Sequence, residues 1–199
     1  MNHFAGFLWI YFVVYAGVAM LWRSVSVYRA TGLNPLRLPA TDDAPGYVGR
    51  MFKVVLALCF VYLTALTLGW QSDNIAPPMA WLDNAYGRAF GWGVLVVSGL
   101  GVVLAQKQMG LSWRIGLDAD TPGPLVTYGL FARSRNPIFL SMRLNLWALM
   151  CLLPNAVSML LLVSGELLIQ IQVRLEEAHL PLVYGQAYDS YRAKVPRWW

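Results

Sequence analysis

The chain has 199 residues, of which 58% are hydrophobic and only 13% are charged, and its formal net charge is +5. Because a soluble domain carries about 25% charged residues, this composition excludes an ordinary water-soluble protein and indicates an integral membrane protein. The positive charge does not indicate nucleic acid as a partner, since the lysines and arginines are spread over short stretches between apolar runs.

Five apolar segments follow one another along the chain. A membrane-spanning helix needs about 20 residues, and about 17 is the lower limit, so the last two segments are short. Only Pro154 and Asn155 separate these two, which favours a tight helical hairpin. The first segment has no basic n-region and no small-residue cleavage site, so we interpret it as a retained helix rather than a signal peptide. The segments are Phe4–Leu21, Met51–Trp70, Ala89–Ala105, Ile138–Leu153 and Ala156–Ile171.

The stretches between the segments differ in charge. Residues 22–50, residues 106–137 and the tail after residue 172 hold four basic residues each, whereas Arg88 is the only one in residues 71–88. Basic loops of membrane proteins face the cytoplasm, so this alternation predicts five spans with the N-terminus outside and the C-terminus in the cytoplasm.

The predicted fold class is therefore an all-α integral membrane protein with five transmembrane helices. We interpret residues 1–199 as one domain, in which 1–105 hold the first three spans and 106–199 hold a cytoplasmic loop, the helical hairpin and C-terminal helices. Cys59 and Cys151 lie inside apolar segments without a CxxC or a nearby histidine, so both are expected to be core residues.

The short turn fixes the register of the hairpin that it joins. If the hairpin is centred between Pro154 and Asn155, residues whose numbers add to 309 lie at equal depth. Arg143 and Glu166 then lie level, roughly 17 Å from the turn at ~1.5 Å per residue. An unpaired charge at that depth costs at least about 2.5 kcal/mol, so we predict that the two side chains form a salt bridge or share a polar cavity.

Further polar residues follow this pair toward the cytoplasmic surface. Glu166, Gln170, Arg174 and Glu177 lie at helical spacing and form one polar stripe. The same register places Arg135 level with Arg174, so two polar clusters that are distant in the sequence are expected to meet at the membrane surface. Two interpretations of the paired charges remain open: they lock the hairpin, or they line the path by which a lipophilic ligand enters.

Two motifs in the C-terminal half carry a resemblance to a known family. LVTYGLFARSRNPIF (Leu125–Phe139) resembles LVTxGxYxxxRHPxY, the cofactor motif of the isoprenylcysteine carboxyl methyltransferase and phospholipid methyltransferase superfamily. RLEEAHLPLVYGQAYDSYRAKVPRWW (Arg174–Trp199) resembles its ending, EExxLxxxFGxxYxxYxxxVPR. The motifs occur in the expected order, separated by one helical hairpin. MGLSWRIGLD (Met109–Asp118) resembles a bacterial branch, which implies a bacterial inner-membrane location.

Members of this superfamily are membrane enzymes that bind S-adenosylmethionine on the cytoplasmic side, so the resemblance implies this cofactor. Arg135, Asn136 and Glu177 occupy the expected catalytic positions. Glu176 is expected to accept hydrogen bonds from the ribose hydroxyls or the ammonium group, and Arg135 to bind the carboxylate. Cofactor contacts are implied for Leu125, Val126, Phe131, Asn136, Pro137, Ile138, Phe139 and Glu176, and substrate contacts are expected from Arg143, Glu166, Gln170, Gln172 and Arg174.

The chain departs from the family pattern at several positions. Asn136 stands where His is common, and Phe131 and Phe139 stand where Tyr is common. Asparagine cannot act as a base near neutral pH, which argues against any mechanism with an imidazole at that position. Gln172 stands where eukaryotic relatives carry an Arg proposed to hold the substrate, which argues against a prenylcysteine carboxylate as the substrate.

The tail contains several aromatic residues. Tyr188 and Tyr191 are expected on an amphipathic helix that ends at Pro196. Trp198 and Trp199 are expected to anchor this helix at the membrane interface, where tryptophan is enriched.

Three functions are compatible with the sequence. The first is a methyltransferase that moves a methyl group from S-adenosylmethionine to a lipophilic or membrane-associated acceptor bearing a carboxylate, an amine or a thiol. The alternatives are an NADPH-dependent reductase with an architecture similar to sterol reductases, and a non-enzymatic scaffold or solute conduit. No metal site is predicted, because His3 and His179 are the only histidines and lie far apart in the sequence.

Overall fold

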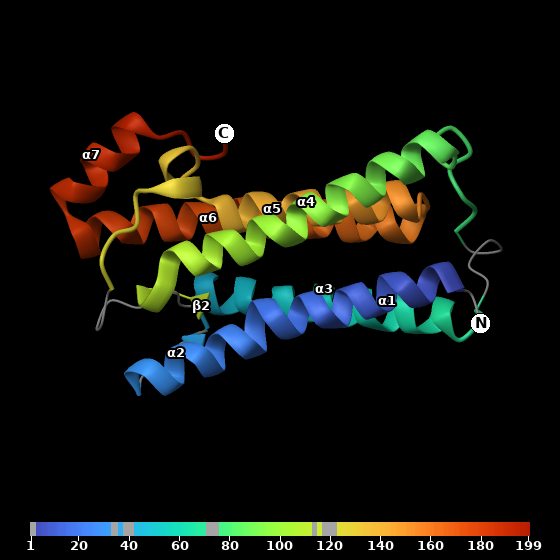
Figure 1. Ribbon diagram of the computed structural model, residues 1–199, viewed down its shortest axis with the longest axis horizontal. Coiled ribbons are helices and arrows are strands. Elements are labelled where there is room, and N and C mark those ends of the chain that lie inside the picture. Colours follow the sequence, from blue (N-terminus) through green and yellow to red (C-terminus); the bar gives the residue numbers. More distant parts are fainter. Residues whose placement is uncertain (1–2, 33–35, 38–41, 71–75, 113–114, 117–122) are drawn as a thin grey trace.

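The structure, a computed structural model, describes residues 3–32, 36–37, 42–70, 76–112, 115–116 and 123–199, and it is almost wholly helical (Figure 1). Within these residues, four helices are long and apolar enough to cross a membrane: Phe4–Thr31, Ala44–Thr67, Ala85–Met109 and Ala156–Tyr184. A fifth apolar helix, Pro137–Leu152, is shorter. The prediction of an all-α membrane protein is therefore confirmed.

The elements follow the chain in a simple order. The first long helix is divided into α1 (His3–Ala16), a π-helical stretch η1 (Gly17–Trp22) and α2 (Arg23–Thr31). The others are β1 (Leu36–Arg37), α3 (Ala44–Thr67), α4 (Ala85–Met109), η2 (Gly110–Ser112), β2 (Ile115–Gly116), η3 (Gly129–Ala132), α5 (Pro137–Leu152), α6 (Ala156–Tyr184) and α7 (Gln186–Lys194).

Side chains at the helix starts satisfy backbone N–H groups that the helix itself leaves without a partner. Asp43 accepts from Gly46 N at 2.8 Å before α3, and Asn84 accepts from Gly87 N at 2.9 Å before α4. Asn155 accepts from two N–H groups of the first turn of α6. The Pro154–Asn155 break is thus a real turn between α5 and α6, as predicted.

Two helices are longer than the apolar segments that they contain. The first continues past Leu21 to Thr31, and α6 continues past Ile171 to Tyr184, so the expectation that the last segment is short is wrong. Each helix ends where Gly32 or Gly185 adopts a positive φ, 69° and 54°. Hydropathy falls where the lipid ends, but a helix of good helix formers continues until a residue stops it.

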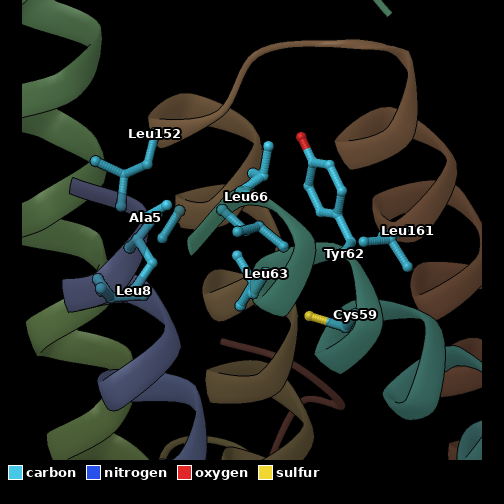
Figure 2. Close-up of a cluster of buried hydrophobic side chains, with 11 residues drawn as sticks. Ala5, Leu8, Cys59, Tyr62, Leu63, Leu66, Leu152 and Leu161 are labelled. Carbon is cyan, nitrogen blue, oxygen red and sulfur yellow. The ribbon is translucent and has the colours of Figure 1, made fainter. Parts of the chain in front are cut away.

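The helices form two layers, with α1 and α3 on one side and α4, α5 and α6 on the other (Figure 1). A buried cluster lies where the layers meet, and Figure 2 shows Leu8 of α1, Leu63 of α3, Leu152 of α5 and Leu161 of α6 within it, each at most 3% exposed. Because lipid is as apolar as these side chains, close packing rather than the hydrophobic effect holds the helices together.

Both cysteines belong to this interior. Cys59 and Cys151 are buried and free, which confirms their interpretation as core residues. A hydrogen bond joins the start of α6 to α3 in the same region, where Asn155 Nδ2 donates to Tyr62 Oη at 2.7 Å.

The loops divide between the two ends of the bundle (Figure 1). At one end β1 pairs with β2 in parallel, and α7 packs near η3. At the other end Met79 N donates to Pro154 O at 2.6 Å, and the ring of Phe4 lies 5.9 Å from that of Trp92. The described parts of the three basic stretches therefore lie at the end opposite the N-terminus, in the alternation that their charges indicate.

Candidate functional site

The site begins at the turn before α5. Tyr128 Oη donates to Gln108 O, and Leu130 N donates to the Gln108 side chain, each at 2.8 Å. Gly129 lies between them with φ +63°, and a Cβ there would collide with the Gln108 side chain. Only glycine suits this position, because an L side chain is strained at this φ and has no room.

The polar residues that follow hold the C-terminal tail. Arg135 N donates to Pro196 O at 3.0 Å, and Ser134 Oγ donates to Arg197 O at 3.2 Å. The Arg135 side chain adds hydrogen bonds from Nη1 to the carbonyl oxygens of Arg192 and Val195, at 3.1 and 2.8 Å. This turn therefore binds the backbone of the tail in addition to starting α5.

A buried carboxylate, that of Glu177 on α6, completes the arrangement. Arg135 donates to it at 3.2 and 2.9 Å, Asn136 at 2.8 Å, and Arg197 at 3.1 and 2.8 Å. The hydrogen bond to Glu177 also raises the pKa of Arg197. We call Ser134, Arg135, Asn136, Glu177 and Arg197 the Glu177 cluster. A carboxylate that is only 6% exposed needs such partners, since an unpaired buried charge is strongly destabilising.

Burial of the cluster revises the expected role of Arg135. Four of its five N–H donors are engaged, two with Glu177 and two with tail carbonyl oxygens. The expectation that Arg135 binds the cofactor carboxylate does not fit these contacts. Asn136 is also engaged, because its Nδ2 donates to both Glu177 and Arg197 O.

The predicted polar stripe is present over part of its length. Gln170 Nε2 donates to Glu166 Oε1 at 2.8 Å, and Arg174 Nη1 donates to Gln170 Oε1 at 2.7 Å. The stripe does not continue to Glu177, which contacts Arg135 instead. The two polar clusters nevertheless meet as predicted, because Arg135 contacts Glu177, which lies about one helical turn past Arg174 on α6.

The neighbouring carboxylate has different contacts. Gln172 Nε2 donates to Glu176 Oε1 at 2.9 Å, and no residue that the structure describes donates to the second oxygen of Glu176. Of the two consecutive glutamates, Glu177 is thus the centre of a saturated cluster, and Glu176 keeps an oxygen for another partner.

The tail helix α7 covers the extended segment before η3. Tyr188, Tyr191 and Val195 form a buried group against Leu125. Tyr191 Oη donates to Phe131 O at 2.7 Å, and burial raises the pKa of Tyr191 to about 12. Through α7 the structure thus brings the two resembling motifs together.

Tyr188 differs from Tyr191 in its hydroxyl group. The residue is 1% exposed, yet its hydroxyl has no hydrogen-bond partner among the described residues. Burial first, and then the charge of Glu177, raise the pKa of Tyr188. A buried hydroxyl without a partner costs about 1–3 kcal/mol, so this group is a candidate for contact with a ligand.

The remaining predicted cofactor residues lie in the segment before η3 and in the first turn of α5, and of these Leu125 packs against the buried tyrosines. Leu125 and Val126 are partly buried in a segment without helix or strand, and no described residue bonds to their backbone N–H groups. Pro137 is buried at the start of α5, and Ile138 and Phe139 are partly buried in its first turn. No hydrogen bond joins those last two to the Glu177 cluster in the described structure.

The predicted charge pair within the membrane helices is confirmed. Arg143 Nε donates to Glu166 Oε2 at 2.8 Å. The guanidinium also lies over Trp198, with its Cζ 4.3 Å from the ring centroid. The tail thus folds back and stacks the Trp198 ring on Arg143, and the anchoring of the tail at the membrane interface stays a prediction. Trp199 is 68% exposed, beside Arg133.

Three important residues had no predicted role. Ser134 and Gln108 act through hydrogen bonds that no sequence pattern signals. Arg197 had a signal, because two consecutive glutamates beside a membrane require cations, and the tail supplies few of them.

In comparisons with known proteins, no family model matches the chain and no curated protein matches its sequence.

Proposed function

We propose that the protein is an integral-membrane methyltransferase that transfers a methyl group from S-adenosylmethionine to a lipophilic acceptor. One observation supports this most. The segments that resemble the family motifs, residues 125–139 and 174–199, are separated by a hairpin, yet they share the Glu177 cluster and the buried group around Tyr188. Such convergence is expected if both segments serve one site.

The groups left without a described partner suit this cofactor. The backbone N–H groups of Leu125 and Val126 and the hydroxyl of Tyr188 are donors, and the second oxygen of Glu176 is an acceptor. An adenine ring, ribose hydroxyls, an ammonium and a carboxylate offer matching groups. When bound, S-adenosylmethionine supplies an activated methyl group for in-line displacement, a reaction governed mainly by positioning.

In this proposal the Glu177 cluster positions rather than reacts. Arg135, Asn136 and Glu177 are bonded to one another and to the tail, so they hold α6, α7 and the turn before α5 in fixed relation. No imidazole is needed, because a displacement on a sulfonium does not require a base at Asn136.

The proposed topology has five spans, with α5 as the fourth. Its first turn adjoins the Glu177 cluster and its last turn adjoins Pro154, so it runs from one end of the bundle to the other (Figure 1). Its 16 residues extend about 24 Å, less than the ~30 Å hydrocarbon core, so its ends require polar partners near the interface. The basic end faces the cytoplasm of a bacterial inner membrane, where the cofactor is available.

Thermal unfolding of the purified protein in an uncharged detergent tests the cofactor. S-adenosylhomocysteine should raise the melting temperature in a concentration-dependent manner, and NADPH should not. Stabilisation by NADPH alone would favour the reductase, and stabilisation by neither would favour a non-enzymatic protein.

A single-atom change sharpens this test. Tyr188→Phe removes only the unpartnered hydroxyl and should weaken S-adenosylhomocysteine binding about 10-fold, the typical effect of one hydrogen bond. Tyr86→Phe is the matched control, because Tyr86 is 89% exposed at the other end of the bundle. Equal affinity in both variants would remove Tyr188 from the site.

A further inference from the structure

Arg143 has donors that its protein contacts do not use. Its Nε donates to Glu166, and Trp198 covers one face of the guanidinium. No residue that the structure describes accepts from Nη1 or Nη2, which carry four N–H groups. Both oxygens of Glu166 are engaged, one with Arg143 and one with Gln170.

The surroundings of this pair are apolar and face outward. Trp147 lies one turn from Arg143 on α5, and Val163 and Leu167 flank Glu166 on α6. They are 52%, 48% and 59% exposed, respectively. The Arg143 side chain itself is 23% exposed. A polar pair therefore opens onto a surface that lipid covers, and N–H donors without acceptors are costly there.

We propose that Arg143 binds an oxyanion, a carboxylate or a phosphate, carried by a membrane-embedded amphiphile. We further propose that this amphiphile is the methyl acceptor, a step that rests on the proposed function. The amphiphile's chain would lie along the exposed apolar side chains while its head group accepts from Nη1 and Nη2.

The free groups select this ligand chemistry. A guanidinium fork matches carboxylate and phosphate oxygens. A ligand that only donates would leave Nη1 and Nη2 of Arg143 without an acceptor, whereas an oxyanion supplies one. A quaternary ammonium likewise supplies no acceptor for Nη1 and Nη2, and it would lie beside the positive charge of Arg143. Arg143, Glu166 and Arg174 together carry one positive charge, which a single oxyanion neutralises.

The tail connects this site to the Glu177 cluster. Arg197 donates to Glu177, and the next residue, Trp198, lies under Arg143. The position of the aromatic wall of the oxyanion site thus depends on the same tail that covers the proposed cofactor site.

Direct binding to the purified full chain in uncharged maltoside micelles tests the proposal. The probes are palmitate, hexadecyl phosphate and neutral hexadecanol, which share one chain length. We expect at least one acid to bind and hexadecanol not to bind. Preference for palmitate would identify a carboxylate as the head group, and preference for hexadecyl phosphate a phosphate. Equal binding of hexadecanol and the acids would overturn the proposal.

Three variants locate the contact. Arg143→Gln should weaken the preferred acid about 10- to 100-fold, as expected for lost charge-assisted hydrogen bonds. Arg192→Gln, a control at the same end of the bundle, should change it little because Arg192 is exposed and pairs with Asp189. Glu166→Gln keeps an acceptor oxygen for Nε but removes the competing charge, so it should tighten binding. A role in locking the hairpin alone predicts no such gain.

Binding of S-adenosylhomocysteine is measured separately from binding of the acid, and it shows whether each variant is folded. The affinity for S-adenosylhomocysteine should stay unchanged in Arg143→Gln. A further variant, Arg143→Lys, keeps the charge but loses the guanidinium fork, so it should also bind the acid more weakly. Equal losses in the Arg143 and Arg192 variants would overturn the site. Acid binding without any S-adenosylhomocysteine binding by the unmodified chain would instead overturn the proposed function and leave the oxyanion site standing.

Discussion

Glu177→Gln tests whether the Glu177 cluster holds the tail on the bundle. The substitution keeps the shape of the side chain but removes the charge that two arginines share. Arg135 is only 10% exposed, so its charge would remain buried without a counter-charge, whereas Arg197 is 33% exposed and can turn toward water. Breaking a buried pair by removing one partner costs about 3–5 kcal/mol, and the exposed arginine adds at most about 1 kcal/mol.

The loss of stability in Glu177→Gln can be measured by thermal unfolding. For a chain of this size, 1 kcal/mol shifts the melting temperature by about 2–4 °C, so a total loss of about 3–6 kcal/mol lowers it by roughly 6–24 °C. The buried cysteines Cys59 and Cys151 supply the assay, because a thiol-reactive fluorogenic dye labels them only on unfolding. Tail release should also speed tryptic cleavage after Arg192 and Lys194.

Glu176→Gln is the matched control, one residue away on the same helix. Glu176 accepts one described hydrogen bond, from Gln172, and that bond can persist with a glutamine. The control should melt within a few degrees of the unmodified protein. Equal melting temperatures for the Glu177 and Glu176 variants would refute the reasoning, because they would mean that the buried charge contributes no more than the half-satisfied one.

Three further predictions concern the scaffold. Gly129→Ala should lower the free energy of unfolding by about 1–3 kcal/mol, since it places a side chain at positive φ, and the dye assay measures this loss. Asn155→Ala should cost about 2–4 kcal/mol in that assay, because it removes a helix cap and a buried partner of Tyr62; a loss no larger than that of a simple cap would discount the tyrosine contact. Cysteines at the exposed positions Tyr86 and Ser190 should differ in intact cells, with only the first labelled by an impermeant reagent; labelling at position 190 would contradict the topology.

The sequence predicted contacts best where geometry leaves little freedom. A turn of two residues sets the register of α5 against α6, so counting along the chain sufficed to pair Arg143 with Glu166. The same count brought the polar cluster of Arg135 to that of Glu177, and the two side chains do form an ion pair. It could not tell that Arg135 binds Glu177 and not Glu176. Near the α5–α6 turn the backbone geometry determines which residues are in contact. At the other end of the hairpin the contacts depend on the long side chain of Arg135 and on the tail.

Helix ends were mispredicted for a related reason. Hydropathy reports where lipid gives way to water, and α6 passes that boundary without interruption. The signal for its true end was present in Gly185, since glycine commonly terminates helices in the left-handed region. The contact of Trp198 with Arg143 was not predicted, because the preference of tryptophan for interfaces is an average over many proteins and carries no information on a nearby arginine.

The polar run before α5 has a physical explanation that does not depend on catalysis. A helix that merely crosses a membrane needs no Ser134, Arg135 or Asn136 at its start. A tail that must stay on the bundle does need them, because its backbone carbonyl groups near Pro196 require donors and Glu177 requires cations. This explanation does not account for three groups that have no described hydrogen-bond partner. They are the Tyr188 hydroxyl, one oxygen of Glu176 and the Nη1 and Nη2 atoms of Arg143. They lie on three elements that the tail holds together, and a structural role for the tail alone gives no reason for them to remain without partners.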